Sequence, residues 1–84
     1  MYRVIPDSLV LDQVAALPVD ALPAYAEALT VLEIAPVNGR PYNADHPERP
    51  MRELVFGANG EGTITYLLLD QAREVHLLLV QWLG

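Results

Sequence analysis

The side chains best suited to chemistry in this 84-residue chain are two histidines and a set of arginines. His46 and His76 can exchange protons near neutral pH. Arg49, Arg52 and Arg73 could stabilise the negative charge that develops during phosphoryl transfer. The chain has no cysteine and its two histidines are far apart in sequence, so no zinc-ligand spacing exists. We therefore expect no metal and no cofactor.

Arg52 and Tyr66 each have a structural alternative to a catalytic role. Arg52 is in phase with Leu54 and Phe56 on a predicted strand, where it could pair with an acid across the sheet. Tyr66 is in phase with Ile64 on the next predicted strand, a position typical of a core tyrosine whose hydroxyl reaches the rim. Both residues are catalytic candidates that the strand pattern also explains as structural residues.

His76 and Trp82 lie on the last predicted strand. His76 is in phase with Leu78, Val80 and Trp82, so a histidine satisfied inside an apolar strand is the alternative to a catalytic role. Trp82 could anchor a partner protein, because tryptophan is enriched in binding hot spots, or it could close the core. The candidate binding residues are thus Trp82 and the three arginines named above.

The composition predicts a single small domain spanning residues 1–84. Apolar residues make up 52% of the chain, and its net charge is −6. The apolar runs are far shorter than the roughly 20 residues of a membrane span, and the first residues lack the pattern of a signal peptide. We therefore expect a cytoplasmic protein with no membrane partner. The acidic balance argues against sequence-independent nucleic-acid binding, which depends on lysine and arginine.

The first half of the chain predicts one strand followed by two helices. Residues 1–6 suit a short strand, which a proline ends. Asp7 or Ser8 can cap a first helix that stops near Leu17, and Asp20 can cap a second helix. The second helix has one apolar stripe, formed by Leu22, Tyr25, Leu29 and Leu32. Residues 37–50 then have no periodic pattern and predict a loop.

The last third predicts three antiparallel strands, at residues 51–57, 62–69 and 74–83, joined by short hairpin connectors. The predicted fold is therefore α+β, in the order β-α-α-β-β-β, with two helices on one face of a small, mostly antiparallel sheet. The first strand can pair in parallel beside a central strand through the helical crossover. The last strand is apolar at nearly every residue, which suits a central position buried on both faces.

This order of elements resembles the RelE/ParE superfamily of bacterial toxins over nearly the whole chain. The segments that carry the resemblance are Gly39-Arg40-Pro41, Arg52-Glu53-Leu54-Val55, Thr65-Tyr66-Leu67 and Val75-His76-Leu77-Leu78-Leu79-Val80. The resemblance implies a small toxin held inactive by a cognate antitoxin protein. In the RelE-like branch the toxin cleaves mRNA on the ribosome, using arginine, tyrosine and sometimes histidine. In the ParE-like branch the toxin inhibits DNA gyrase instead.

The chain departs from the RNA-cleaving pattern at two places. These toxins usually carry an arginine a few residues before the strand tyrosine, and here the residue three before Tyr66 is Thr63. They also continue past the last strand into a basic or aromatic tail, whereas this sequence stops at Gly84. Phosphoryl transfer needs positive charge at the transition state, so both departures weaken the ribonuclease prediction.

Three hypotheses therefore follow from the sequence. The first is a toxin-like component of a toxin-antitoxin system that acts as a ribosome-dependent mRNA endoribonuclease, with Arg52, Tyr66 and His76 as catalytic candidates. The second is a non-catalytic protein-interaction module of the same fold, or a gyrase-directed toxin. The third is a homodimer in which Trp82 and the apolar last strand form the interface.

Overall fold

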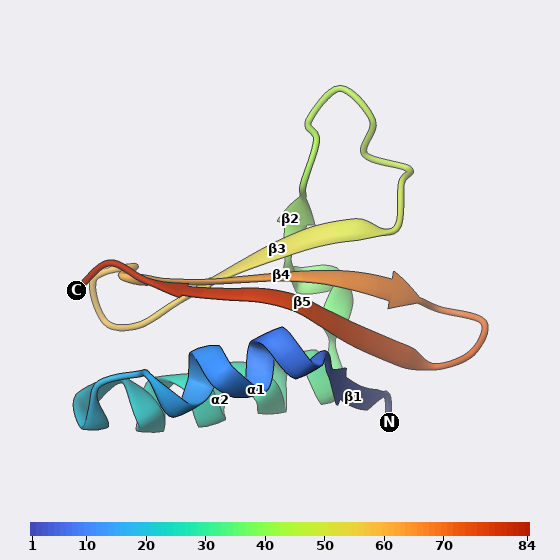
Figure 1. The fold of residues 1–84 in the computed structure, drawn as a ribbon. Helices are drawn as coiled ribbons and strands as arrows, with labels where there is room; N and C mark the ends of the chain where they lie inside the picture. Colours follow the sequence, from blue (N-terminus) through green and yellow to red (C-terminus); the bar gives the residue numbers. More distant parts are fainter.

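The structure, a computed structural model, describes residues 1–84 as two helices packed against one mixed sheet (Figure 1). In chain order the strands and helices are β1 (Arg3–Pro6), α1 (Ser8–Ala15), α2 (Leu22–Ile34), β2 (Arg40–Pro41), β3 (Met51–Phe56), β4 (Gly62–Leu69) and β5 (Glu74–Trp82). Two short 3-10 turns, η1 (Val19–Ala21) and η2 (Pro36–Asn38), flank α2. The predicted α+β class is confirmed, and so is the predicted order, to which the structure adds β2.

The strands are arranged in the order β1-β5-β4-β3-β2. β1 pairs with β5 in parallel, with Val4 opposite Val75, and every other pair of neighbours is antiparallel. The first strand therefore lies beside a central strand, as the helical crossover predicted. Both helices lie on one side of the sheet, α1 against β5 and β1, and α2 against β1 and β3 (Figure 1). No helix covers the other side.

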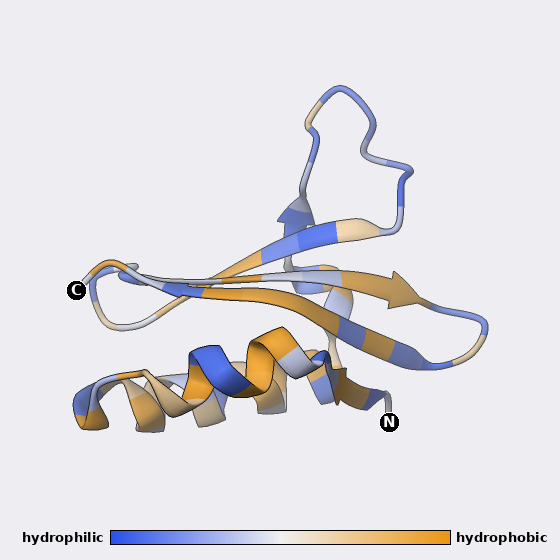
Figure 2. Cartoon of the chain, viewed as in Figure 1, coloured by the Kyte–Doolittle hydropathy of each residue, from blue (hydrophilic) through white to orange (hydrophobic).

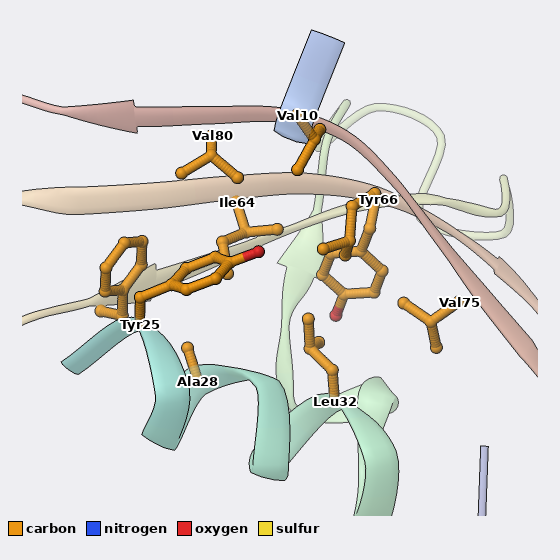
Figure 3. Close-up of a cluster of buried hydrophobic side chains, with 10 residues drawn as sticks. Val10, Tyr25, Ala28, Leu32, Ile64, Tyr66, Val75 and Val80 are labelled. Atoms are coloured by element: carbon orange, nitrogen blue, oxygen red, sulfur yellow. The ribbon is translucent and has the colours of Figure 1, made fainter. Parts of the chain in front are cut away.

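The core lies between the sheet and the helices. Its largest fully buried side chains are Val10, Leu32, Pro36, Ile64, Tyr66, Val75 and Leu77. Figure 3 shows α2 side chains such as Ala28 and Leu32 pointing toward the sheet, and the Tyr66 ring pointing from β4 toward α2. Aromatic packing extends this core toward the C-terminus, because the Phe56 ring lies 6.0 Å from the Tyr25 ring and 5.7 Å from the Trp82 ring.

A β-bulge in β5 changes the phase of that strand. Thr65 pairs with Leu79 while Tyr66 pairs with Leu77, so Leu78 is an extra residue with no partner of its own in β4. A bulge of this kind interrupts the strict alternation of side chains. On β5, odd-numbered residues therefore face the helices before the bulge, and even-numbered residues face them after it.

The bulge corrects two expectations about β5. His76 lies on the uncovered side of the sheet, whereas Val80 is buried and Trp82 packs against the core on the helical side. The predicted common phase of these residues was wrong, because alternation restarts at the bulge. β5 is central as predicted, but its burial alternates along the strand. Burial on both faces was wrong because only one side of the sheet is covered.

Both helices begin without the predicted side-chain caps. Asp7 occupies the N-cap position of α1, but its side chain makes no capping hydrogen bond. Asp20 lies within η1, which leads directly into α2, so the second helix begins through a tighter turn that starts at Val19.

No single helix is long and apolar enough to cross a bilayer. Only the segments Ser8–Ala15 and Val19–Ile34 taken together reach that length, and they are bent by 117°.

The segment between α2 and β3 contains more structure than the sequence predicted. η2 and the two-residue strand β2 replace the first part of the predicted loop, with Arg40 opposite Glu53 of β3. A short edge strand was missed because only its pairing with β3 defines it. Residues 42–50 form the remaining loop, which projects away from the sheet on the side opposite the helices (Figure 1).

Candidate interaction surfaces

Arg52 and Tyr66 meet on the helical side of the sheet and bind the same backbone segment. The Tyr66 hydroxyl donates a hydrogen bond of 2.5 Å to the carbonyl oxygen of Pro36. The Arg52 Nη2 donates to the carbonyl oxygens of Gly39, at 2.5 Å, and Val37, at 3.4 Å. These carbonyls belong to η2 and to Gly39 directly after it, so the two side chains hold the chain between α2 and β2 in place.

The packing around Tyr66 leaves no space for another molecule. A Cβ at Gly39 would overlap the Tyr66 hydroxyl, so only glycine fits there. Burial raises the pKa of the Tyr66 hydroxyl, although the nearby Arg52 acts in the opposite direction. The Arg52 Nε is buried and has no hydrogen-bond partner. Tyr66 is therefore fully buried and Arg52 is half-buried, and both side chains are already engaged with main-chain groups.

His76 lies on the other side of the sheet, within an ion-pair group at the β1 edge. Its Nε2 donates a hydrogen bond of 2.9 Å to Glu74 Oε1, and Arg3 pairs with the second oxygen of the same carboxylate. The hydrogen bond from His76, assisted by Arg3, lowers the pKa of Glu74 below its ordinary value. The sheet thus separates His76 from the pair formed by Arg52 and Tyr66, and the three catalytic candidates do not converge on one site.

The remaining predicted binding residues lie at three separate places. Arg49 is in the projecting loop and lines a hollow of about 390 Å³ with Tyr42 and Met51. Arg73 lies in the turn between β4 and β5, where its guanidinium stacks 4.5 Å from the centroid of the Tyr2 ring. Trp82 is half-buried against Phe56 at the C-terminal end of β5. The structure does not bring these residues together.

Charged residues are unevenly distributed along the sequence, and the fold places the two parts of the chain on different surfaces. We call residues 7–39, which contain both helices and both 3-10 turns, the helical layer. It contains five acidic residues and no basic one: Asp7, Asp12, Asp20, Glu27 and Glu33. All five arginines and the other six acidic residues lie outside it, so the rest of the chain has a net charge of −1. The acidity of the protein is therefore concentrated on one side.

The helical layer also exposes many apolar side chains. Those that are at least one third exposed are Leu9, Leu11, Val19, Leu22, Val31, Ile34 and Val37. Figure 2 shows apolar colour along both helices, interrupted by hydrophilic positions. The layer thus presents a mixture of apolar side chains and carboxylates and contains no basic residue of its own. Arg52 of β3 contacts it only at the carbonyl oxygens of Val37 and Gly39.

We call the uncovered side of the sheet the open face, and its centre is apolar. One row of neighbouring side chains runs across four strands, from Ile5 through His76 and Leu67 to Met51. Leu79 lies in the next row, and Val55, at 43% exposed, lies in the third. Uncharged polar residues share these rows: Thr65, at 4% exposed, lies beside Leu79, and Thr63 lies between Val55 and Gln81. Ile5, His76, Leu67, Met51 and Leu79 are half-buried. The open face is therefore a mainly apolar surface that no helix covers.

The charges of the open face are paired and cancel. At the β1 edge Arg3 pairs with Glu74, and at the β2 edge Arg40 pairs with Glu53 at 2.6 Å. In both pairs the glutamate is about one-fifth exposed and the arginine is much more exposed. Two cations and two anions on this face give a formal charge of zero. The open face and the helical layer therefore share exposed apolar groups but differ in charge.

Two structural residues were missed by the sequence analysis. Gln13 of α1 accepts a hydrogen bond of 2.7 Å from the Val80 N–H, at a part of β5 that lies beyond the end of β1. Gly39 packs against the Tyr66 hydroxyl, although it was named above only as part of the Gly39-Arg40-Pro41 segment of the family resemblance. The uneven distribution of charge, in contrast, could have been found by counting signs along the chain.

No family model, curated protein or solved structure matches this chain.

Proposed function

We propose that this protein is a non-catalytic protein-interaction module, the toxin-like member of a cytoplasmic toxin-antitoxin pair. It binds its partner protein through the helical layer, and the partner contributes a segment that is both basic and apolar. The observation that carries the proposal is the composition of this layer, in which five carboxylates and no cation accompany exposed leucine, valine and isoleucine side chains. Such a surface attracts cations and gains from the burial of its apolar groups.

The placement of the catalytic candidates supports a non-catalytic role. Cleavage of an RNA phosphodiester requires an acid or base and a cation close to the same phosphate. Here Arg52 and Tyr66 bind main-chain carbonyls on the helical side, whereas His76 pairs with Glu74 on the open face. The three groups could act together only after a rearrangement of the sheet. The separation of these groups favours a binding role over the endoribonuclease alternative.

The chemistry of the helical layer limits what its partner can be. Carboxylates on one side of an interface repel acidic segments and accelerate the approach of basic ones. Exposed apolar side chains between the carboxylates add affinity only for a segment with apolar groups at matching spacing, as in an amphipathic helix. The cognate antitoxin expected from the family resemblance would therefore dock through a basic amphipathic segment.

A pair of synthetic peptides tests this binding mode directly. Both are amphipathic helices with the same leucine positions, and the polar positions are lysine in one and glutamate in the other. We expect the lysine peptide to bind and the glutamate peptide to show no binding by isothermal titration calorimetry. Equal binding of both peptides, or no binding of the lysine peptide, would contradict the proposal.

Matched charge variants locate the binding surface. Asp12→Asn with Glu27→Gln removes two carboxylates from the helical layer, and each is expected to weaken binding of the lysine peptide by about two- to fivefold. The control is Asp45→Asn with Glu48→Gln, which changes the net charge equally but in the loop on the other side of the sheet. An equal loss of affinity in both double variants would show that only the total charge matters, and the helical layer would not be the site.

A cellular test separates the module from its catalytic alternative. Induced expression in a bacterial host should leave ribosome-bound mRNA intact, because the catalytic candidates lie on opposite sides of the sheet. Ribosome-dependent cleavage that is lost in His76→Gln would instead support the endoribonuclease. Growth arrest with intact mRNA and inhibited DNA supercoiling would indicate a gyrase-directed toxin.

A further inference from the structure

We propose that the open face binds a second copy of this chain, so that the protein forms a symmetric dimer with the two sheets face to face. This inference goes beyond the proposed function, because it concerns a different surface and a different occupant. It rests on the apolar character, the charge, the size and the surroundings of the open face.

The apolar residues of the open face are placed to pack against another sheet. Ile5, Leu67 and Met51 lie in one row that crosses the sheet, with Leu79 and Val55 in the following rows. Stacked sheets pack about 10 Å apart through interdigitating side chains of this kind. An apolar sheet face left in water is unusual, because small domains generally cover such a face with another layer.

Charge favours a second copy over a charged partner. The open face has two arginines and two glutamates in local pairs, so its formal charge is zero in a chain whose net charge is −6. Two copies can therefore approach through this face without strong repulsion. Association through the helical layers would instead place five uncompensated carboxylates against another five. Of these two apolar surfaces, only the open face is electrostatically compatible with its own copy.

The size of the face suits only a small interface. The five strands contain 29 residues, and β1 and β2 at the edges contribute only four and two of them. At about 3.3 Å per residue and about 4.8 Å between strands, they give a flat area of about 460 Å² before side-chain relief is included. A standard interface buries about 800 Å² on each partner, so the estimated area predicts a dimer of low affinity.

The projecting loop adds a contact at the edge of the open face. Residues 42–50 rise on the same side of the sheet as the open face (Figure 1). Tyr42 is 55% exposed in this loop, and the hollow beside it reaches Met51 at the end of the apolar row. A second copy lying on the open face would therefore meet this loop as a wall along one edge. The loop contains Asp45, Glu48 and Arg49, so the open face and the loop together have a formal charge of only −1.

Sedimentation equilibrium of the full chain tests the inference. We expect a mass twice that of the chain at high concentration, with dissociation on dilution. The dissociation constant should change by less than about twofold between about 0.05 and 0.5 M salt, because the open face itself has no net charge and the loop adds only one negative charge. A monomer at every concentration would overturn the inference, and so would a dimer that forms only at high salt, where repulsion between the acidic layers is screened.

Two matched variants identify the surface. Val55→Glu places a carboxylate on the open face, and we expect it to weaken dimerisation by at least about tenfold. Ile34→Glu makes the same type of change on the helical layer, where the isoleucine is 66% exposed, and should leave the dimer intact. Because both side chains are already exposed, both variants should remain folded, which circular dichroism verifies. The opposite pattern would place the interface on the helical layer and contradict the inference.

A third measurement keeps this inference separate from the proposed function. The lysine peptide is titrated into wild type and into Val55→Glu, and both are expected to bind it equally. A monomeric wild type that binds the peptide would overturn the dimer alone. A wild-type dimer that ignores the peptide would overturn the proposed function alone.

Discussion

The two outer surfaces of this protein expose similar side chains but differ in charge. The helical layer has five carboxylates and no cation among its exposed leucines and valines. The open face has an apolar centre between two ion pairs that cancel each other. The comparison shows that exposed apolar area alone does not identify a partner. The accompanying charges decide whether a basic segment, or a neutral surface such as a second copy, is compatible.

Substitutions on the covered side of the sheet should lower the free energy of unfolding more than substitutions on the open face. We expect this to be the largest difference between the two sides. Leu32→Ala removes a fully buried side chain of the covered side and is expected to lower stability by about 2–5 kcal/mol. Leu67→Ala acts on the half-buried open face and should cost about 1 kcal/mol. Urea denaturation at low protein concentration measures both. Equal losses would show that the open face is as tightly packed as the core, which contradicts the comparison.

Tyr66 connects the core with the backbone of the helical layer. Tyr66→Phe leaves the buried carbonyl of Pro36 without its donor and should lower the free energy of unfolding by about 1–3 kcal/mol. Because burial raises the pKa of Tyr66, the neutral hydroxyl is favoured in the folded state. Its contribution is complete below the ordinary tyrosine pKa of about 10 and is lost as the pH rises through the higher folded value.

Denaturation midpoints measured between pH 7 and about 11 should therefore fall less in Tyr66→Phe than in wild type. The variant keeps some alkaline sensitivity, because burial also raises the pKa of Tyr25. Identical alkaline profiles of wild type and variant would show that the Tyr66 hydroxyl is accessible to solvent.

Salt should separate the two surfaces in a single experiment. Binding of the lysine peptide to the helical layer is expected to weaken by about tenfold between about 0.05 and 0.5 M salt, because exposed charges are screened. Dimerisation through the open face should be nearly unchanged over the same range. Both affinities can be measured on the same sample by calorimetry and sedimentation. If both affinities responded to salt alike, the assignment of charge to one surface would be wrong.

The smallest expected effect concerns Glu74 at the edge of the open face. Its pKa is lowered by the hydrogen bond from His76 and by Arg3, so the carboxylate stabilises the folded state above the ordinary glutamate pKa of about 4.3. This contribution is lost as the pH falls through the lower folded value. Thermal denaturation between about pH 6 and pH 3 should therefore be less acid-sensitive in Glu74→Gln.

Glu74→Gln also leaves Arg3 unpaired on the open face. The dimer of this variant should become more sensitive to salt than the wild-type dimer, because each face would then carry one net positive charge. The matched control is Glu61→Gln. Glu61 also has a lowered pKa, owing to backbone hydrogen bonds, but it lies in the β3–β4 turn. If dimerisation of both variants depended equally on salt, the Arg3–Glu74 pair would not be the cause of the effect.

Local patterns predicted most of the fold. Prolines and apolar spacing located the first strand and the two helices, and hairpin connectors located the three-stranded meander. Three features were missed or wrong: the strand β2, the bulge at Leu78 and the absence of side-chain caps at Asp7 and Asp20. β2 and the bulge exist only through pairing with a neighbouring strand, which local propensity does not report.

For the candidate residues too, the local pattern predicted one part of the placement and contacts with distant segments decided the rest. The alternation along β3 and β4 correctly placed Arg52 and Tyr66 on the side of Phe56 and Ile64. The sequence did not predict that both would bind the carbonyls of a segment 13–30 residues earlier in the chain. His76 was assigned to the wrong phase because the bulge lies between it and Val80. Their roles as catalytic residues stay predictions.

The sequence by itself determined the class of fold, the order of its elements and the separation of charge between residues 7–39 and the rest of the chain. These properties follow from the order of residue types along the chain, so they are present before any folding. The tertiary structure decided which side chains share a surface, since strand register places Ile5, Leu67 and Met51 in one row with His76. It also decided that this row stays uncovered, because both helices pack on the same side of the sheet.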